Sequence, residues 1–413
     1  MTTLGFTRAD ALALDEADPL RSLRHRFVIP DGVIYLDGNS LGALPCHVPA
    51  RLAQVVEREW GQGLIRSWND AAWIDAPRRI GAKIARLIGA AADEVVVTDS
   101  TSVNLFKLLV AAARLRPGRN VLLTERTNFP TDLYIVASVA ELLGLAVVRV
   151  DADAVLGALD VNVAVLALTH VDYRTGRLTA IRELTAAAHA AGAVALWDLS
   201  HSAGVIDVEL DAVHADFAAG CGYKYLNGGP GAPAFAFVAR RHHETVRQPL
   251  AGWLSHALPF AFADDYLPAP GIDRLQCGTP PMLSLLALDS ALDVFDGVDL
   301  AALRCKSQLL GDLFIRLFDE ALGPYGFELV SPRNAQVRGS QVSLTHPQGY
   351  AVVQALIARG IIGDFRTPDI LRFGLAPLYV RFVDVFDAVV AIGEIMATDD
   401  WKRPQFLSPK IVT

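Results

Sequence analysis

Lys224 is placed where a lysine needs a chemical reason. It lies between Tyr223 and Tyr225, and a glycine-rich turn and then an apolar run typical of a buried strand follow it. An ammonium group is costly to bury without a partner. Either Lys224 reaches outward to water, or the fold holds its nitrogen in a cavity where it takes part in a reaction.

A carboxylate, Asp198, follows the apolar run at 193–197, one short predicted strand (216–219) before Lys224. The two side chains are therefore expected in one crevice. This pair suits pyridoxal phosphate, because the lysine forms a Schiff base with the aldehyde and the aspartate keeps the pyridine nitrogen protonated. Asp198 alone also fits a helix N-cap. With His201 it would fit a metal, but no further ligand is near in the sequence.

The same cofactor carries a phosphate and an aromatic ring. Backbone N–H groups and hydroxyls at a helix N-terminus bind phosphate, and Thr101 and Ser102 lie in a polar turn between a strand and a helix. Phe129, in a loop after a strand, offers a face for the ring. Taken singly, these residues also fit helix capping and packing. Together with the lysine and the aspartate, they match what one cofactor requires.

Strands and helices that alternate from about residue 80 must position these residues. Apolar strands are predicted at 94–97, 120–123, 146–150, 163–168 and 193–197, with helices between them. The alternation predicts an α/β fold whose mainly parallel sheet is flanked by helices. In such sheets the ligand lies beyond the carboxyl ends of the strands.

The pattern changes after about residue 290. A long helix-like stretch at 292–320 precedes short strands at 328–330 and 342–344. We therefore predict a large cofactor-binding domain at 60–290 and a small α+β domain at 291–413. The N-terminal segment 1–59 is expected to associate with the small domain.

Composition limits the function classes. The chain has 413 residues, 52% of them hydrophobic and 20% charged, with a net charge of -8, which is ordinary for a globular protein and does not suggest a nucleic-acid surface. The four cysteines lack CxxC spacing, as expected for reduced thiols. The N-terminus does not resemble a signal peptide, and no apolar run approaches the roughly 20 residues that cross a bilayer. We expect a cytoplasmic protein without a metal, a membrane or a nucleic-acid partner.

Seven segments resemble the signature segments of the kynureninase family, in order along nearly the whole chain. YKYLNGGPG and LRFGLAPLY are more specific than the Asp…Lys spacing that all fold-type-I pyridoxal phosphate enzymes share. The resemblance implies a fold-type-I, transferase-like fold. It also implies a homodimer whose active site lies between a large and a small domain and is completed by the neighbouring subunit. The segments are YLDGNSLG (35–42), NFPTDLY (128–134), DLSHSAG (198–204), YKYLNGGPG (223–231), GWLSH (252–256), CGTPP (277–281) and LRFGLAPLY (371–379).

The resemblance also implies roles for single residues. Lys224 resembles the Schiff-base lysine, Tyr223 a phosphate ligand that assists proton transfer, and Asp198 the pyridinium partner. The other implied cofactor contacts are the phosphate-binding pair Thr101 and Ser102, the stacking ring Phe129, the polar neighbours Asp132, Thr169 and His201, and Trp253 and Thr279 from the other subunit.

For the substrate, Arg372 resembles the arginine that holds the α-carboxylate. A guanidinium fork binds a carboxylate through two parallel hydrogen bonds and keeps its charge. The alternative is a surface arginine. Asn39 and Ser40 are implied near the substrate, and Trp68 is implied in the pocket for the aryl group.

The implied reaction is hydrolysis of L-kynurenine, 3-hydroxykynurenine or both. The products are anthranilate or 3-hydroxyanthranilate, and L-alanine, in tryptophan catabolism and NAD biosynthesis. One alternative is a related enzyme, such as a cysteine desulfurase or an aminotransferase-like protein. A desulfurase needs a mobile cysteine near the substrate, and only Cys221 and Cys277 lie near the right segments. A second alternative is a non-catalytic binding protein on the same fold.

Overall fold

A computed structural model describes residues 5–408, and the chain folds into two compact units. Unit 1 comprises the described parts of Met1–His47 and Val294–Thr413 together with Tyr173–Leu178, and unit 2 comprises Val48–Asp172 and Thr179–Asp293. Residues 48–59, which the sequence analysis groups with the small domain, thus lie in unit 2. The reason is packing, because Val48 buries its side chain against Ala287 and Ala291 of the same unit.

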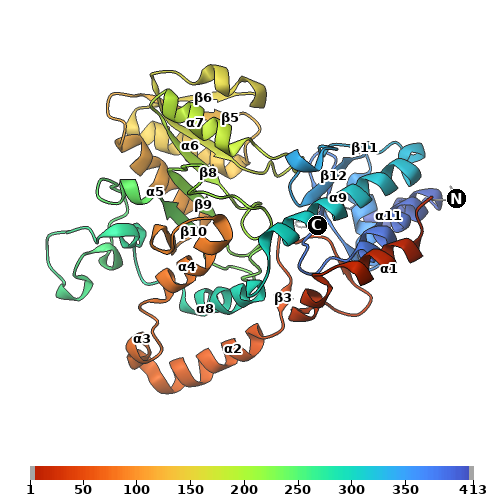
Figure 1. Ribbon diagram of the computed structural model, residues 1–413, viewed down its shortest axis with the longest axis horizontal. Coiled ribbons are helices and arrows are strands. Elements are labelled where there is room, and N and C mark those ends of the chain that lie inside the picture. Colours follow the sequence, from red (N-terminus) through yellow and green to blue (C-terminus); the bar gives the residue numbers. More distant parts are fainter. Residues whose placement is uncertain (1–4, 409–413) are drawn as a thin grey trace. The chain divides into compact units, whose positions relative to one another are not determined.

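Unit 2 is built on a seven-stranded sheet (Figure 1). Only β10 runs antiparallel to its neighbours, β4 and β9, so the predicted mainly parallel sheet is confirmed. In spatial order the strands are β4 (Val95–Val97), β10 (Phe235–Val238), β9 (Phe217–Gly220), β8 (Val194–Asp198), β7 (Val163–Thr169), β5 (Val121–Glu125) and β6 (Ala146–Val150).

Helices cover both faces of this sheet (Figure 1). Alternate residues of a strand point to opposite faces. On β8, Leu196 packs into the core that α5 and α6 share, whereas the next residue, Trp197, donates a hydrogen bond of 3.0 Å to Thr185 of α7. The helices of unit 2 are α2 (Val48–Gln54), α3 (Ser67–Asp70), α4 (Ala76–Ile88), α5 (Thr101–Arg114), α6 (Pro130–Leu143), α7 (Ile181–Ala190) and α8 (Met282–Ala291).

Unit 1 contains a smaller antiparallel sheet with helices. Its four strands, in spatial order, are β11 (Glu328–Leu329), β12 (Gln341–Thr345), β15 (Ile370–Gly374) and β14 (Asp364–Arg366). Two short pairs join β1 (Phe27–Val28) to β3 (Leu44–Pro45) and β2 (Ile34–Tyr35) to β13 (Ile361–Ile362). Its helices are α1 (Arg8–Ala17), α9 (Leu300–Ala321), α10 (Gly349–Ala358), α11 (Phe382–Ala397) and α12 (Pro404–Leu407).

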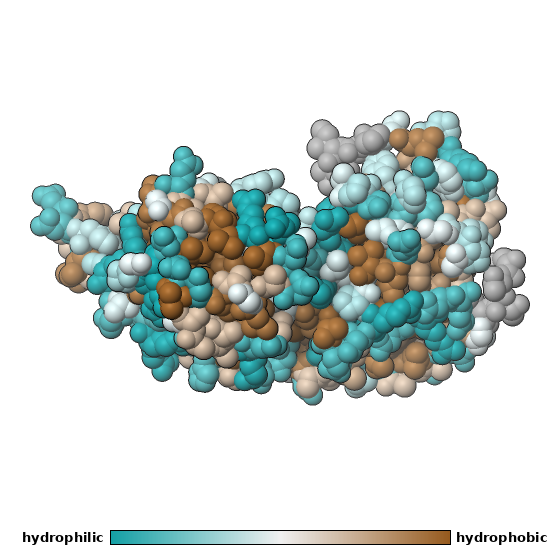
Figure 2. Space-filling view, turned by 90° about the horizontal axis from the view of Figure 1, so that it is seen from above, coloured by the Kyte–Doolittle hydropathy of each residue, from teal (hydrophilic) through white to brown (hydrophobic). Residues whose placement is uncertain are grey.

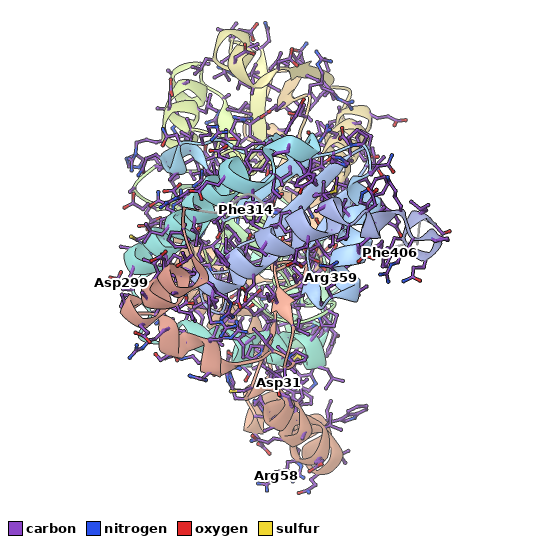
Figure 3. The ribbon with its side chains drawn as sticks, turned by 90° about the vertical axis from the view of Figure 1, so that its right-hand side faces the viewer. Asp31, Arg58, Asp299, Phe314, Arg359 and Phe406 are labelled. Atoms are coloured by element: carbon purple, nitrogen blue, oxygen red, sulfur yellow. The ribbon has the colours of Figure 1, made fainter. Side chains whose placement is uncertain are left out.

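The continuous helix predicted at 292–320 is wrong at its start. A short 3₁₀ turn at Leu292–Phe295 ends before Gly297, whose positive φ of 72° breaks the helical path. Helix α9 then begins afresh, with the side chain of Asp299 accepting a hydrogen bond from the backbone of Ala301. Phe314, near its middle (Figure 3), is fully buried against Phe373 of β15.

The surface mixes residue types. On the face drawn in Figure 2, hydrophobic areas are interspersed among hydrophilic ones. Within residues 5–408, no helix is long and apolar enough to cross a membrane.

Candidate active site

The carboxyl ends of five strands of unit 2 lie along one edge of its sheet. Thr169, Asp198 and Ala219 are register partners at the ends of β7, β8 and β9. β4 and β5 run in the same direction as these strands. The segments that follow them carry most of the predicted cofactor residues: Thr101, Ser102, Phe129, Asp132, Thr169, Asp198, His201, Tyr223 and Lys224.

Lys224 does not extend into bulk water. Its side chain is half-buried, and its Nζ lies 2.9 Å from Nε2 of His201, which is itself buried. Burial raises the pKa values of Asp198 and Asp132, and the positive charge of Lys224 opposes both rises, so both carboxyls lie within its field. The structure thus places the amine and the carboxyl groups at one site.

Asp198 and Asp132 form a buried pair of carboxyl groups. Each is 6% exposed. Asp198 Oδ1 accepts hydrogen bonds from the backbone N–H (2.9 Å) and the hydroxyl (2.6 Å) of Ser200. Burial raises the pKa of Asp198, although Ser200 and Lys224 oppose that rise. Burial, and then the charge of Asp198, raise the pKa of Asp132 well above its usual range. Two such neighbours do not both ionise readily.

A cavity of about 10 Å³ lies beside this pair, lined by both carboxyls, Asn128 and apolar side chains of α5, α6, β7 and β8. That is the space of about one water molecule. The floor of the site is therefore closely packed, which holds the two carboxyl groups in place.

The start of α5 is suited to an anion. Thr101 and Ser102 are its first residues, so their backbone N–H groups have no partner within the helix. The preceding Asp99 has a positive φ of 49° and receives a 2.6 Å ion pair from Lys107, which is fully buried. Lys107 also donates to the backbone oxygen of Leu275, and so links the turn at Asp99 to the segment that contains Leu275.

An aromatic ring and a phenol lie on the segments that follow β5 and β9. Phe129, at the N-cap of α6, is 38% exposed. The ring centroid of Tyr223 lies 6.0 Å from Nζ of Lys224. Burial, followed by the neighbouring Cys221 and Asp198, raises the pKa of Tyr223, so its phenol keeps its proton at neutral pH.

For three further predicted residues of unit 2, the structure describes ring contacts of two and the exposure of the third. Trp253 packs edge-on against Phe260, and Thr279 lies exposed in a loop. Trp68, on α3, packs edge-on against Trp73. These contacts do not link the three residues to the group around Lys224.

The predicted substrate residues of unit 1 form a group of their own. Arg372 is only 2% exposed, which contradicts the surface alternative. It binds Asp364, the hydroxyl of Ser40 and the backbone oxygen of Tyr173. Asn39 is fully buried and donates to Gln341, although the bond is long at 3.3 Å.

Sequence reasoning missed three charged members of this group. Asp364 pairs with Arg372, and Arg366 binds both Asp364 (2.8 Å) and the Ser40 hydroxyl. Asp37 lies just before Asn39, and its Oδ1 is buried with no hydrogen-bond partner among the described residues. The signal for the first two was present, since Asp364 and Arg366 alternate with apolar residues a few positions before Arg372.

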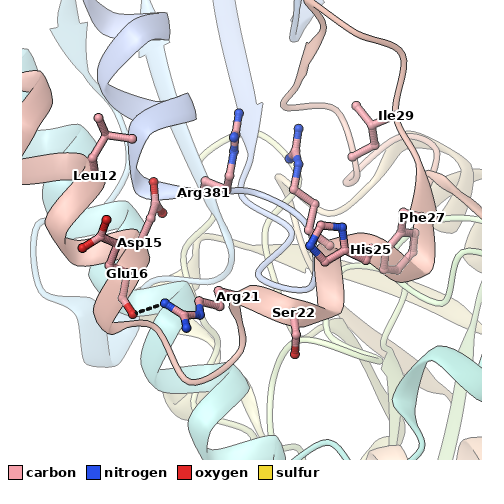
Figure 4. Close-up of a pocket in the computed structure, with 10 residues that line it drawn as sticks. Leu12, Asp15, Glu16, Arg21, Ser22, His25, Phe27, Ile29 and Arg381 are labelled. Atoms are coloured by element: carbon pink, nitrogen blue, oxygen red, sulfur yellow. Dashed lines mark hydrogen bonds between the residues drawn. The ribbon is translucent and has the colours of Figure 1, made fainter.

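A separate hollow of about 630 Å³ lies beside α1 in unit 1 (Figure 4). Asp15 accepts from the backbone N–H groups of Phe382 and Val383, and Arg21 donates to the backbone oxygen of Glu16. These contacts cap α11 and fix the turn after α1. No predicted site residue lines the hollow.

Metal binding finds no support in the geometry. Across the described part of the chain, no three His, Cys, Asp or Glu side chains are grouped so that they could hold an ion.

Comparison with solved structures agrees with this architecture. The fold matches an apo cysteine desulfurase from Thermococcus onnurineus NA1, with a TM-score of 0.77, 20% identity, and 91% of this chain and 98% of the other covered. It also matches a mutant of C-DES that has glycine covalently linked to its PLP cofactor, with a TM-score of 0.79, 16% identity, and 90% and 99% covered. At such identities the likeness concerns the fold alone, and it confirms the predicted fold-type-I class.

Sequence relatives are more specific. A family model described as the kynureninase C-terminal domain matches residues 303–392. Kynureninase from Burkholderia mallei (strain SAVP1) is 51% identical over 98% of this chain and 100% of its own length. Kynureninase from Pseudomonas fluorescens is also 51% identical, over 97% and 98%. The resemblance seen in the motifs is thereby confirmed, and the chain belongs to the kynureninase family.

Proposed function

We propose that the protein is a pyridoxal phosphate-dependent kynureninase. It hydrolyses L-kynurenine, 3-hydroxykynurenine or both, to anthranilate or 3-hydroxyanthranilate and L-alanine. The observation that carries this proposal is the half-buried amine of Lys224, 2.9 Å from His201 and within the field of two buried carboxyls, in a chain of this family.

The residues at the sheet edge fit the cofactor. The orphan N–H groups of Thr101 and Ser102 suit its phosphate, and the aromatic ring of Phe129, in the loop after β5, suits stacking. Asp198, held by Ser200, supplies the negative charge that keeps the pyridine nitrogen protonated. When bound, the cofactor supplies an electron sink for the carbanion that forms at the substrate.

The other contacts around the cofactor follow from their chemistry. Burial, and then the charge of Asp198, raise the pKa of Asp132, which favours its protonated form as a hydrogen-bond donor. Thr169 and His201 complete the polar contacts. The hydroxyl of Thr169 donates a long hydrogen bond of 3.3 Å to the backbone oxygen of Val171. A cofactor oxygen at a shorter distance would replace that weak bond.

Proton transfer falls to residues of this chain. Lys224 attaches the cofactor and, once released, removes the α-proton of the substrate. His201, in hydrogen-bond contact with Lys224, accepts or returns a proton at Nζ. Tyr223 keeps its phenolic proton, so it is the donor that we assign to the late steps.

Substrate recognition is assigned to unit 1 and to Trp68. Arg372, held rigid by Asp364, binds the α-carboxylate, with Asn39 and Ser40 beside it. Trp68 is assigned to the aryl pocket, where a flat apolar face suits the substrate ring.

A homodimer is part of the proposal. Trp253 and Thr279 would then serve the phosphate of the partner subunit. The support is apolar exposure on a helical arm of unit 2, formed by α2 and the helical segment η2 (Val55–Gly63) (Figures 1 and 3). On and just after η2, Trp60 is 56% exposed and Ile65 is 77% exposed. Exposed apolar side chains in such numbers mark interaction surfaces.

Cellular roles follow from the reaction. The four cysteines are free, as expected for a protein of the reducing cytoplasm. Cleavage of kynurenine places the enzyme in tryptophan catabolism, and its hydroxylated substrate would connect it to NAD biosynthesis.

A fluorescence assay tests the function. Purified holoenzyme should release anthranilate from L-kynurenine and no sulfide from L-cysteine. Its kcat/KM for the two kynurenines fixes the preferred substrate. Lys224→Ala should lower turnover by at least about a thousandfold, because it removes the attaching amine and the base together. Lys402→Ala, at an exposed position with its ion pair to Asp399, is the control. Anthranilate release by Lys224→Ala at the wild-type rate would refute the assignment.

A further inference from the structure

Two guanidinium groups lie on one face of the small sheet in unit 1. Arg372 on β15 is the register partner of Asp364 on the edge strand β14. Arg366 lies two residues beyond Asp364, and side chains two residues apart on a strand share a face. Asp364 Oδ2 accordingly contacts both arginines, with 2.8 Å to Arg366.

Arg372 has few free donors. Its Nε donates to Asp364 (2.7 Å), its Nη2 to Asp364 and to the Ser40 hydroxyl (3.1 Å), and its Nη1 to the backbone oxygen of Tyr173 (2.8 Å). A guanidinium has five N–H groups, so these bonds occupy four. A carboxylate that reached Arg372 would find one N–H, whereas a bidentate contact needs two.

Arg366 has the donors that Arg372 lacks. Its Nη2 binds Asp364 and the Ser40 hydroxyl (3.3 Å), and its Nη1 binds the backbone oxygen of Phe365 (3.0 Å). No partner is described for its Nε within residues 5–408, and one Nη1 hydrogen is also unassigned. The side chain is 37% exposed, against 2% for Arg372. A ligand therefore meets Arg366 more readily than Arg372.

The charges of the cluster favour one added anion. Arg366 and Arg372 carry two positive charges, and Asp364 carries one negative charge. The nearby Asp37 is substantially protonated at neutral pH, because burial and the charge of Asp364 raise its pKa to about 7. Burial also raises the pKa of Tyr35, which is neutral. One carboxylate would balance the remaining positive charge.

We propose that Arg366 is a second ligand of the substrate α-carboxylate, binding it together with Arg372. Asp364 positions the two guanidinium groups side by side, and the Ser40 hydroxyl, which contacts all three, fixes their spacing. The inference rests on the proposed function, because the carboxylate is that of the amino-acid substrate and of the product L-alanine.

The test compares two small probes on the holoenzyme. L-alanine carries the carboxylate and ethylamine lacks it, and the binding of both is read from the visible absorbance of the holoenzyme. Arg366→Gln should weaken the binding of L-alanine by about tenfold or more, which is the effect of a lost charged hydrogen bond. It should change the affinity for ethylamine by less than about twofold. It should also raise KM for L-kynurenine more than it lowers kcat.

Arg359→Gln is the matched control. Arg359 lies just after α10 in the same unit (Figure 3), its side chain is 32% exposed, and it pairs with Glu394 and Asp400. Its loss should leave both probes unchanged. Arg366→Lys keeps the charge but not the fork, so its affinity for L-alanine should lie between wild type and Arg366→Gln.

The outcomes separate the proposals. Unchanged L-alanine binding in Arg366→Gln, or equal weakening of both probes, would overturn the role of Arg366 and leave the proposed reaction intact. Absence of anthranilate formation by the wild-type enzyme would overturn the reaction, whatever the L-alanine result. If the circular dichroism of Arg366→Gln shows that this variant does not fold, the affinity of Arg366→Lys for L-alanine is measured instead. An affinity equal to that of the wild type would then overturn the role of Arg366 as a carboxylate ligand.

Discussion

Replacing Asp364 by asparagine probes the buried ion pair that organises the carboxylate site. Asp364 and Arg372 are each 2% exposed, and Asp364 also accepts from Arg366 (2.8 Å) and from the Ser40 hydroxyl (2.6 Å). Asparagine keeps the shape, removes the charge and replaces one acceptor oxygen by an NH₂ donor. At least one N–H or O–H group that now donates to Asp364 would then face another donor, the NH₂ group of the asparagine. The charge of Arg372 would also lose its buried partner.

The expected cost is large for a single substitution. Removing one partner of a buried pair costs about 3–5 kcal/mol, because an uncompensated charge remains inside. We expect the lower end, about 3 kcal/mol, since Arg372 keeps its bonds to Ser40 and to the backbone oxygen of Tyr173.

The pH dependence has a defined sign. Burial alone would raise the pKa of Asp364, but the hydrogen bonds and charges of Arg372 and Arg366 outweigh it and lower that pKa overall. The pair therefore stabilises the fold above the unfolded-state pKa of about 3.9. That stability is lost as the pH falls through the lower, folded-state value. Wild type and Asp364→Asn should converge in strongly acidic solution.

Asp319→Asn is the matched control, since its pair has the same bidentate geometry at the surface. Arg333 donates to Asp319 at 2.8 and 2.9 Å, with side chains 60% and 47% exposed. Such pairs contribute about 0.2–1 kcal/mol. Hydrogen exchange of peptides that cover β14 and β15 reports the local free energy of opening. Equal losses in the two variants, or a loss in Asp364→Asn that does not shrink as the pH falls through the acidic range, would refute this reasoning.

Two further predictions concern pH and assembly. Burial and Asp364 raise the folded pKa of Asp37 from 3.8 to about 7, so ionised Asp37 destabilises the fold above that value. Asp37→Asn should therefore raise the free energy of unfolding by about 2–4 kcal/mol at pH 8. Measured by urea unfolding, this gain should vanish towards pH 4. A gain that is constant with pH would contradict this cause. Ile65 is 77% exposed, and Ile65→Glu should shift the sedimentation of the protein from dimer to monomer. Leu407→Glu, at a side chain 49% exposed on α12, is the control and should not. An unchanged dimer in Ile65→Glu would exclude the arm from the interface.

Much of the sheet of unit 2 is predictable because its central strands are buried on both faces. Such strands are continuous apolar runs that end at polar turns, and β7, buried along its whole length, covers the predicted 163–168 and Thr169. The start of α9 was not predictable in this way. The helical pattern continues through 292–295, where three of the four residues are apolar, and the positive φ at Gly297 shows that the chain turns there.

Half of the candidate site also follows from sequence. Lys224 and Asp198 are visible because each follows a strand, and parallel strands bring their ends together. The raised pKa of Asp132 cannot be predicted from the sequence in the same way. Its motif places it near the cofactor, but its raised pKa depends on burial and on the nearby charge of Asp198, which only the packing of α6 on the sheet creates.

The arginine cluster of unit 1 shows why the remaining part escapes sequence analysis. Asp364 and Arg366 alternate with apolar residues on an edge strand, a pattern typical of a polar face open to water. The Ser40 hydroxyl changes that interpretation, because it contacts both arginines from a segment 332 residues before Arg372. Asp37, from the same segment, adds the carboxyl whose pKa is raised to about 7. If the two arginines bind the substrate carboxylate as proposed, its affinity is expected to depend on the segment 37–40, because Ser40 contacts both guanidinium groups and Asp37 contributes to the net charge around them.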